Sequence, residues 1–279
     1  MKNEITDFQK TKELLVCVDS DGCAMDTMDV KHYKCFGPEA VKIWNLHSIE
    51  ELFLKVWNEI NLYTKTRGIN RFKGVVTTFE ALEAEGISMP DISSFKKWTE
   101  TTPELSNPAL EREIEKTNDP QLKQALEWSY AVNRAIGQLS GEDHPFEGAR
   151  EGLEAAARVA DVAIVSSANG GAVLDEWTRH ELAPHVSVML GQEAGTKAHC
   201  IAELKKFSYE NTHVLMVGDA PGDLDAADKN GVLYYPILVG KEKFSWERFR
   251  KEALGKLLDG SFAGAYQQQL IDEFNNNLK

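Results

Sequence analysis

The chain has 279 residues, of which 42% are hydrophobic and 27% charged, a balance that fits a folded protein with a buried core and excludes a disordered or fibrous one. Its 31 Lys and Arg residues against 44 Asp and Glu residues give a formal net charge of −13. That charge argues against nucleic acid and anionic membranes as partners, because both are negatively charged. The polar start lacks the apolar core of a signal peptide, and no apolar run approaches the ~18 residues of a membrane span.

The four cysteines show no paired CxxC spacing. A chain of this length needs no disulfide to fold, so we expect reduced thiols and a cytoplasmic protein. The sequence leaves the oligomeric state open. The cysteines are Cys17, Cys23, Cys35 and Cys200.

Five short apolar runs are predicted to be strands of a parallel sheet. They are rich in β-branched residues and do not alternate with polar ones, which is typical of strands covered on both faces. Helical segments at 151–160, 171–182, 197–207 and 222–230 precede or separate the later runs. This alternation predicts an α/β fold, a doubly wound, Rossmann-like core with five parallel strands. The runs cover residues 14–18, 162–165, 186–190, 214–217 and 232–239.

Residues 25–144 are predicted to form an all-helical domain inserted after the first strand. Ser48 with Glu51 matches a capping box, and Asn107 and Asp119 each precede a Pro, as a helix N-cap often does. The core is then discontinuous, formed by residues 1–24 and 145–279 with a helical tail from residue 245. We expect the insertion to hinge near residues 22–25 and 140–145.

Polar residues follow four of the five runs at the point where each strand ends. Because the carboxyl ends of parallel strands meet at one edge of a sheet, where ligands gather, we expect these side chains to converge. The candidates are Asp19 and Asp21 after the first run, Ser166 and Ser167 after the second, Lys197 after the third, and Asp219 and Asp223 after the fourth.

Each of these motifs alone has a simpler interpretation. The Asp-Ser-Asp-Gly segment at 19–22 fits a turn, the serines fit helix caps, and Lys197 fits a solvated helix residue. The order of four motifs, each after its own strand, favours a shared site instead.

The segments VDSDG, VSS, the Lys197 loop and VGDAPGD resemble the four ordered motifs of the haloacid dehalogenase-like hydrolase superfamily. The resemblance covers the core, residues 13–23 and 145–240, and not the details of the insertion, which stands where the family has a cap domain. Cys23 departs from the family, which usually has Thr or Val at that position.

The resemblance implies a phosphatase that uses Mg²⁺ as its cofactor and forms an aspartyl-phosphate. Asp19 would be the nucleophile and a metal ligand, and Asp21 the general acid and base, with its backbone carbonyl on the metal. The phosphoryl group would be held by Lys197 and by Ser166, which is preferred to Ser167. Further metal ligands would be Asp219 and Asp223.

Residue chemistry alone supports the same interpretation. A carboxylate can attack phosphorus, Mg²⁺ with oxygen ligands offsets the repulsion between two anions, and hydroxyl and ammonium groups hold the remaining phosphoryl oxygens. An acid at Asp21 can protonate an oxygen leaving group, which favours C–O–P esters. Phosphonoacetaldehyde hydrolases, which this chain also resembles, carry Ala there.

Two basic clusters lie in the insertion, at residues 31–34 and 67–71. Guanidinium groups suit carboxylate, phosphate and sugar oxygens, so we expect Arg67 and Arg71 to bind the part of the substrate beyond the phosphate. The alternative for both clusters is ordinary solvated surface.

The function predicted from the sequence is hydrolysis of a small phosphorylated metabolite by a Mg²⁺-dependent phosphatase. Two alternatives remain, a phosphotransferase such as a sugar-phosphate mutase and a non-catalytic binding protein of the same fold. The sequence does not name the substrate.

Overall fold

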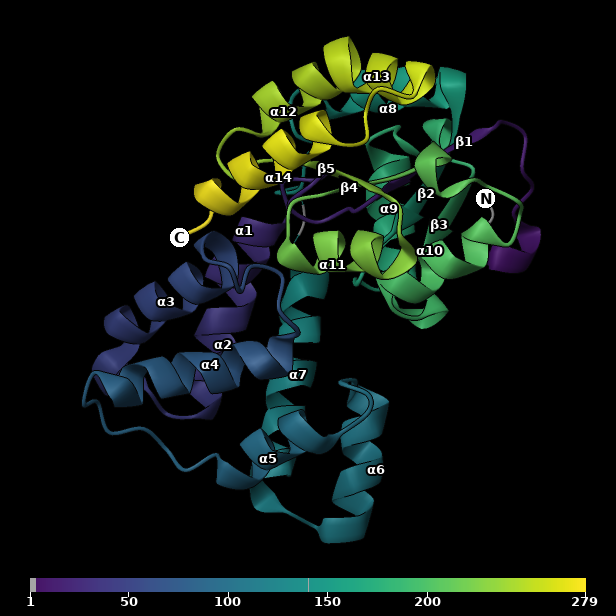
Figure 1. Ribbon diagram of the computed structural model, residues 1–279. Coiled ribbons are helices and arrows are strands. Elements are labelled where there is room, and N and C mark those ends of the chain that lie inside the picture. Colours follow the sequence, from purple (N-terminus) through teal and green to yellow (C-terminus); the bar gives the residue numbers. More distant parts are fainter. Residues whose placement is uncertain (1–3, 140) are drawn as a thin grey trace. The chain divides into compact units, whose positions relative to one another are not determined.

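The computed structural model describes residues 4–139 and 141–279, and the chain divides into two compact units (Figure 1). The first, here the α/β unit, comprises residues 1–28 and 143–279, and the second, the helical unit, comprises residues 29–142. The sequence predicts an insertion at residues 25–144, so the helical unit begins a few residues later and ends slightly earlier than predicted. Ser140, where the second expected hinge begins, lies outside the described residues, as do residues 1–3.

The α/β unit is built on a sheet whose five strands, among the described residues, are all parallel and lie in the order β3-β2-β1-β4-β5. The register places Val18 opposite both Ile164 and Val217. The predicted α/β core with an inserted helical domain is confirmed. The strands are β1 (Leu14–Val18), β2 (Ala160–Val165), β3 (Val188–Leu190), β4 (Val214–Gly218) and β5 (Leu233–Pro236).

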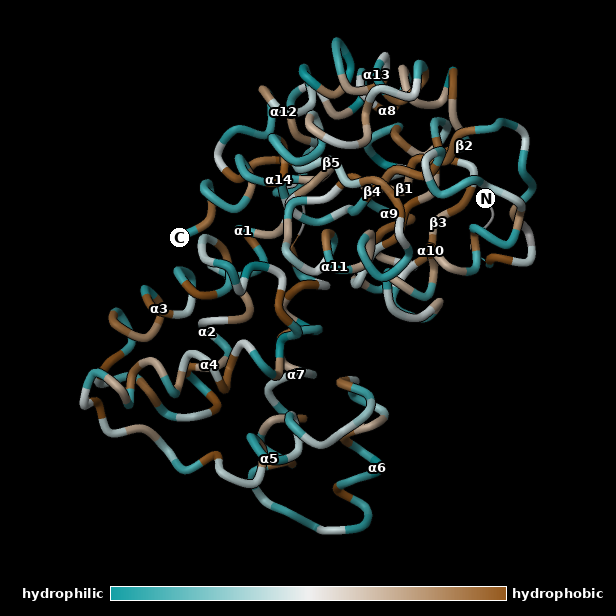
Figure 2. Tube along the Cα trace, viewed as in Figure 1, coloured by the Kyte–Doolittle hydropathy of each residue, from teal (hydrophilic) through white to brown (hydrophobic). Residues whose placement is uncertain are grey.

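Successive strand residues enter two different hydrophobic clusters, one on each face of the sheet. Val16 and Val18 belong to the first, and Leu15 and Cys17 to the second. Burial on both faces explains the uninterrupted apolar runs, which appear brown in Figure 2. The first face is covered by α8 (Ala149–Val159), α9 (Gly170–Arg179), α12 (Glu242–Arg248) and α13 (Leu254–Asp259), and the second by α10 (Lys197–Lys205) and α11 (Pro221–Asn230).

The outer edge of the sheet at β5 is covered by α14 (Ala265–Asn277). The Gln267 side-chain oxygen accepts a hydrogen bond from the backbone N–H of Tyr234, and the rings of Phe274 and Tyr234 meet edge to face at 5.6 Å. A side chain thus satisfies a backbone donor that an open strand edge leaves exposed. The helical tail begins at Glu242, slightly before the predicted residue 245.

The helical unit packs around a core rich in aromatic rings, among them Trp57 and Trp128, which meet at 6.1 Å. Two π-helical turns, at His32–Phe36 and Glu59–Tyr63, interrupt its helices. The short α1 (Met28–Lys31) begins the insertion. The longer helices are α2 (Gly37–Ile43), α3 (Glu50–Asn58), α4 (Arg71–Ala84), α5 (Ser93–Thr101), α6 (Asn107–Thr117) and α7 (Pro120–Gln138).

One of the three predicted caps forms as expected. Asp119 caps α7 by accepting from the backbone N–H groups of Gln121 and Leu122. The α6 cap is Ser106 rather than Asn107, and it accepts from the N–H of Ala109. The predicted capping box at Ser48 is wrong, because a 3₁₀ turn at His47–Ile49 leads into α3 and makes Ile49 its N-cap residue.

The last apolar run extends beyond its strand. β5 ends at Pro236, while Ile237 and Leu238 remain buried in the following turn, where the Ile237 N–H donates to the Gly218 carbonyl. Because the apolar residues stay buried after β5 ends, the hydrophobic run predicts a longer strand than the structure contains. Across the described residues, no helix has the length and apolarity that crossing a membrane requires.

Candidate active site

The ends of β1 and β2 continue the sheet hydrogen bonds by one residue and so fix the backbone of two predicted site residues. The Asp19 N–H donates to the Val217 carbonyl at 3.0 Å, and the Ser166 N–H donates to the Leu190 carbonyl at 2.9 Å. Both side chains are therefore anchored at the carboxyl edge of the sheet, where the motif order placed them.

Lys197, the first residue of α10, lies between two buried carboxylates. Its Nζ is 2.7 Å from Asp19 Oδ2 and 2.5 Å from Asp223 Oδ1. The other oxygen of Asp19 accepts the N–H of Ser20 at 2.8 Å. The structure thus brings together, by direct contact, three residues that the sequence placed in three separate motifs.

Burial and neighbouring charges shift the pKa values of both Asp19 and Lys197. Burial raises the pKa of Asp19 well above its usual value, and the carboxylates of Asp223 and Asp219 raise it further, while Lys197 opposes them. Burial lowers the pKa of Lys197, but Asp19 and Asp223 outweigh it and raise that pKa above its usual value. The cluster therefore carries more negative charge than one ammonium group offsets, a field that favours a further cation.

Asp19, Asp219 and Asp223 form a group that could hold a metal ion. One carboxylate oxygen from each lies within 4.8 Å of the others, and all three residues are buried. Oxygen-only ligands of this kind suit a hard divalent cation such as Mg²⁺. The donor set present in the chain fits the predicted cofactor.

Asp223 is held in place by the chain around it. Its Oδ2 accepts the N–H groups of Asp219 at 3.1 Å and Ala220 at 3.0 Å. Gly218 gives it room, since a Cβ at that position would lie 2.3 Å from the Asp223 carboxyl carbon. The start of α11 therefore orients this carboxylate toward Lys197.

Asp21 lies in a tight turn that follows β1. Thr27 Oγ1 donates to Asp21 Oδ1 at 2.5 Å, and the Gly22 N–H donates to the Met25 carbonyl across the turn. Gly22 has φ +81°, a conformation that favours glycine. The half-buried Asp21 carboxyl is thus oriented by Thr27, a residue that sequence reasoning missed.

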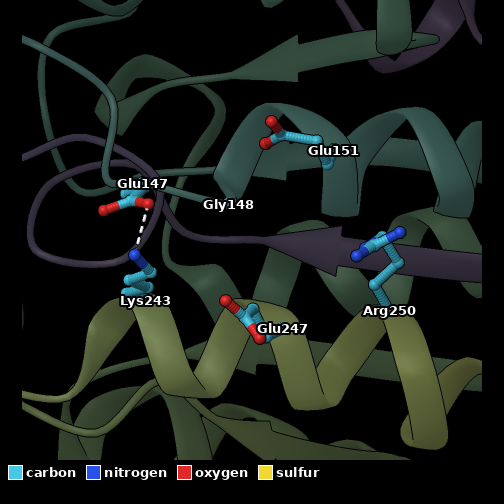
Figure 3. Close-up of a pocket in the computed structure, with 6 residues that line it drawn as sticks. All are labelled: Glu147, Gly148, Glu151, Lys243, Glu247 and Arg250. Carbon is cyan, nitrogen blue, oxygen red and sulfur yellow. Dashed lines mark ion pairs between the residues drawn. The ribbon is translucent and has the colours of Figure 1, made fainter.

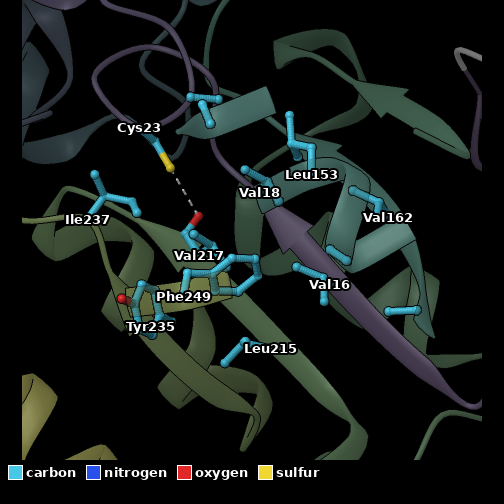
Figure 4. Packing of buried hydrophobic residues seen from close by; sticks show 14 of the residues in the cluster. Val16, Val18, Cys23, Leu153, Val162, Leu215, Val217, Tyr235, Ile237 and Phe249 are labelled. Atoms are coloured by element: carbon cyan, nitrogen blue, oxygen red, sulfur yellow. Dashed lines mark hydrogen bonds between the residues drawn. The ribbon is translucent and has the colours of Figure 1, made fainter. Parts of the chain in front are cut away.

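Two tryptophans donate hydrogen bonds to the same turn. The sequence pattern did not predict these contacts. Trp177 Nε1 donates to Ser20 Oγ at 2.8 Å, and Trp246 Nε1 donates to the Cys23 carbonyl at 3.0 Å. All four residues are buried. The Cys23 thiol points at the Val217 carbonyl, 3.6 Å away (Figure 4), and burial raises its pKa well above the usual value. Cys23 thus has the environment of a packing residue.

The two candidate serines differ in burial. Ser166 is buried, and its hydroxyl accepts the N–H of Ala168 at 3.1 Å, whereas Ser167 is exposed. Ser166 follows β2, the neighbour of β1 in the sheet. Its position agrees with the preference for Ser166 as the phosphate-binding serine, which stays a prediction.

Arg67 and Arg71 have partners inside the helical unit. The buried Arg67 donates to the Leu62 carbonyl, and the half-buried Arg71 donates to Asn133 Oδ1 at 2.7 Å and Ser129 Oγ at 3.2 Å. Arg71 is also the first residue of α4 rather than part of a loop. These contacts give both groups a role in holding the helices together, and binding of substrate by them stays a prediction.

A separate hollow of about 120 Å³ lies between the start of α8 and the α12 region (Figure 3). None of the predicted site residues lines it. Three carboxylates and two cations line it, and Lys243 forms an ion pair with Glu147. The lining residues are Glu147, Gly148, Glu151, Lys243, Glu247 and Arg250.

Solved structures are similar to this chain at low sequence identity. A candidate phosphoglycolate phosphatase from Lactobacillus delbrueckii subsp. bulgaricus is 15% identical, with 80% of this chain and 85% of that chain covered and a TM-score of 0.50. A predicted phosphoglycolate phosphatase from Haemophilus somnus is 17% identical, with 82% and 86% covered and a TM-score of 0.48. A haloacid dehalogenase-like hydrolase from Streptococcus pneumoniae is 14% identical, with 87% and 93% covered and a TM-score of 0.44. No curated protein matches the sequence.

The model of the haloacid dehalogenase-like hydrolase family matches residues 93–235, that is 143 of 279 residues. The matched segment includes Ser166, Lys197 and Asp219, while Asp19 lies outside it. The chain supplies the remaining motif at the end of β1, in contact with Lys197. The chain belongs to the haloacid dehalogenase-like hydrolase family.

Proposed function

We propose that the protein is a Mg²⁺-dependent phosphatase of the cytoplasm that hydrolyses a small phosphorylated metabolite through an aspartyl-phosphate. The observation that carries this proposal is the contact of Lys197 with the buried carboxylates of Asp19 and Asp223, next to a third buried carboxylate, at the carboxyl edge of the sheet. The groups proposed as nucleophile, phosphate-binding cation and metal ligands thus lie together where a parallel sheet binds its ligands.

In the first step, a carboxylate oxygen of Asp19 attacks phosphorus and the bond from phosphorus to the ester oxygen breaks. Asp21 gives its proton to the leaving oxygen, which departs as an alcohol. The hydrogen bond from Thr27 orients Asp21 for this transfer. The products are the aspartyl-phosphate on Asp19 and the Asp21 carboxylate.

In the second step, Asp21 takes a proton from a water molecule, whose oxygen attacks phosphorus. The bond between phosphorus and Asp19 breaks, inorganic phosphate is released and the Asp19 carboxylate is restored. Asp21 is protonated again, so one turnover consumes one water molecule and returns both carboxyl groups to their starting states.

Lys197 and Ser166 bind the phosphoryl oxygens in this proposal. The Lys197 ammonium already lies 2.7 Å from Asp19, so it neutralises the nucleophile and meets the charge that builds on the phosphoryl group. Asp19, Asp219 and Asp223 would hold the Mg²⁺, together with the Asp21 carbonyl. When bound, the ion supplies electrostatic stabilisation to the phosphoryl group.

The proposal leaves recognition of the rest of the substrate to the helical unit. Arg67 and Arg71 are proposed for that role on the chemistry of their side chains. A small metabolite, rather than nucleic acid, agrees with the net charge of −13.

Release of inorganic phosphate from p-nitrophenyl phosphate tests the proposal, measured with Mg²⁺ and again with EDTA. We expect turnover that depends on Mg²⁺, followed by faster turnover of one member of a panel of phosphorylated metabolites. An isomerised sugar phosphate in place of free phosphate would assign a mutase. Binding of phosphate esters without any turnover would assign a non-catalytic protein.

A further inference from the structure

The loop after β2 and the loop after β3 are fastened together by one carboxylate. Glu193 Oε1 accepts the side-chain N–H of Asn169 at 2.6 Å, and Glu193 Oε2 accepts the backbone N–H of Gly170 at 3.0 Å. The first loop carries Ser166, and the second leads into Lys197. Glu193 thus joins the two segments proposed to hold the phosphoryl group.

The backbones of these loops also approach each other closely. The Gln192 N–H donates to the Ala168 carbonyl at 2.8 Å. A Cβ on Gly191 would lie 2.4 Å from the Cα of Gly170, so only glycine permits this approach. The close contact between the two backbones therefore places the Glu193 carboxylate beside the loop after β2.

We infer that Glu193 is a positioning residue, which holds Ser166 and Lys197 at the spacing that binds a phosphoryl group. This inference rests on the proposed phosphatase function. Glu193 acts through Asn169 and Gly170 and has no direct contact with the reacting atoms in this role.

Asn169 connects the Glu193 carboxylate to the start of α9. Asn169 Oδ1 accepts the N–H of Ala172 and so caps α9, while its Nδ2 donates to Glu193. One amide group thereby links the start of α9, the loop with Ser166 and the loop with Glu193. A carboxylate also suits this place, because the first N–H groups of a helix attract negative charge.

Loss of Glu193 leaves these donors to water and releases the loop after β2 from the loop before Lys197. Small displacements of binding groups are costly in catalysis, because the reacting atoms must be held in one geometry. We expect Glu193→Ala to weaken binding of inorganic phosphate and to lower kcat/KM, each roughly tenfold, the order of one lost charged hydrogen bond.

Exchanging the donor and the acceptor of the hydrogen bond between Asn169 and Glu193 tests this link. Asn169→Asp still caps α9 but sets a carboxylate against Glu193, and Glu193→Gln sets an N–H donor against the Asn169 donor. In the double variant, the new Gln donates to the new Asp and still accepts from Gly170, so the link is restored with its partners exchanged. The readouts are the inhibition constant of inorganic phosphate, kcat and KM for p-nitrophenyl phosphate, and the melting temperature.

We expect each single variant to bind phosphate about tenfold more weakly and the double variant to recover most of that loss, with similar melting temperatures throughout. Glu210→Ala, an exposed carboxylate before the amino end of β4, is the control and should match the wild type. Wild-type phosphate binding in the single variants, or a double variant no better than they are, would overturn the inference. Failure of the proposed phosphatase function shows instead in the wild type, as absent phosphate release.

Discussion

The ammonium nitrogen of Lys197 lies 2.7 Å from Oδ2 of Asp19, and the two side chains are 13% and 8% exposed. The two residues come from distant parts of the sequence and meet because β1 lies at the centre of the sheet and α10 packs on one of its faces. Burial raises the pKa of Asp19 well above its usual value and Lys197 opposes that rise, so the ammonium group favours the ionised carboxylate that the proposed nucleophile requires.

The first prediction concerns the nucleophile. Asp19→Asn should abolish phosphate release while keeping the fold, because an amide of nearly the same shape cannot attack phosphorus. Steady-state phosphate release and the circular dichroism spectrum measure the two effects. Asp225→Asn, an exposed aspartate on α11, is the matched control and should keep full activity. Near wild-type turnover by Asp19→Asn would contradict the assignment.

The second prediction concerns Mg²⁺ binding. A ligand present at 100 times its dissociation constant stabilises the folded state by about 2.7 kcal/mol. For a chain of this size, we therefore expect saturating Mg²⁺ to raise the melting temperature by roughly 5–10 °C. Asp219→Asn removes one of three clustered carboxylates and should abolish most of this increase. Equal increases in the variant and the wild type would place Mg²⁺ binding elsewhere.

The sequence predicted the fold because its strands are buried on both faces and their apolar runs are unbroken. It also predicted which residues follow each strand, and parallel pairing then brings Asp19 and Lys197 to one edge. Ser166 could be preferred to Ser167 from position alone, since it directly follows the run, and the structure has the first buried and the second exposed.

The supporting contacts could not be predicted, because they depend on which side chains meet in three dimensions. The hydrogen bond from Trp177 to Ser20 joins α9 to the turn after β1, and no local pattern marks either residue. Arg71 shows the opposite case: its charge suggested a ligand contact, while its partners are Ser129 and Asn133 of α7. Residue type alone does not distinguish a guanidinium that holds helices together from one that binds a substrate.

The third prediction concerns Arg71. Arg71→Ala loses hydrogen bonds to Asn133 and Ser129 and the contact of the guanidinium with the Phe36 ring, 5.1 Å away. We expect the free energy of unfolding to fall by about 2 kcal/mol. Denaturant titration of the full chain, followed by tryptophan fluorescence, measures it.

Lys73→Ala, an exposed residue of the same helix, is the control for Arg71 and should change stability little. If Arg71 also binds substrate, its loss should raise KM for the physiological ester roughly tenfold and change KM for p-nitrophenyl phosphate much less. Unchanged stability would show that the contacts with Asn133 and Ser129 contribute nothing.

The fourth prediction concerns stability at low pH. Asp161, a buried residue of β2, accepts hydrogen bonds from the backbone N–H groups of Thr11 and Lys12 and from the Thr11 and Tyr209 hydroxyls. Burial raises the pKa of Asp161, but the hydrogen bonds, first those of the Thr11 and Tyr209 side chains, outweigh it and lower the pKa below its usual value. The ionised form is thus the form that holds the segment before β1.

A lowered folded-state pKa stabilises the protein above the unfolded-state pKa of about 3.9, and this contribution is lost as pH falls through the folded-state value. Asp161→Asn should therefore reduce stability by about 1–3 kcal/mol at pH 7 and by clearly less near pH 3. Melting temperatures measured between pH 3 and pH 7 test this, with Asp228→Asn, an exposed aspartate, as control. A difference that stays constant with pH would contradict the assignment.

The last prediction concerns Gly218, the final residue of β4. A Cβ there would lie 2.3 Å from both Cγ and Oδ2 of Asp223 and 2.4 Å from its Cβ, closer than real Cβ atoms approach other atoms. Hydrogen bonds hold both Gly218 and Asp223 in place. The Gly218 carbonyl accepts hydrogen bonds from the Tyr234 hydroxyl and the Ile237 N–H, and Asp223 is bound by the N–H groups of Asp219 and Ala220.

Gly218→Ala should therefore displace the Asp223 carboxylate from Lys197, because a side chain moves more easily than the end of β4, which is hydrogen-bonded to a strand on each side. We expect kcat to fall by about 100-fold or more, as for misplacement of a binding group by about 1 Å, together with weaker Mg²⁺ binding measured by calorimetry. Gly222→Ala is the matched control, since a Cβ there meets nothing within 4 Å. In the first turns of α11 it should leave activity unchanged and raise stability by up to about 1 kcal/mol. Equal activity in the two variants would show that the position of Asp223 does not limit the reaction.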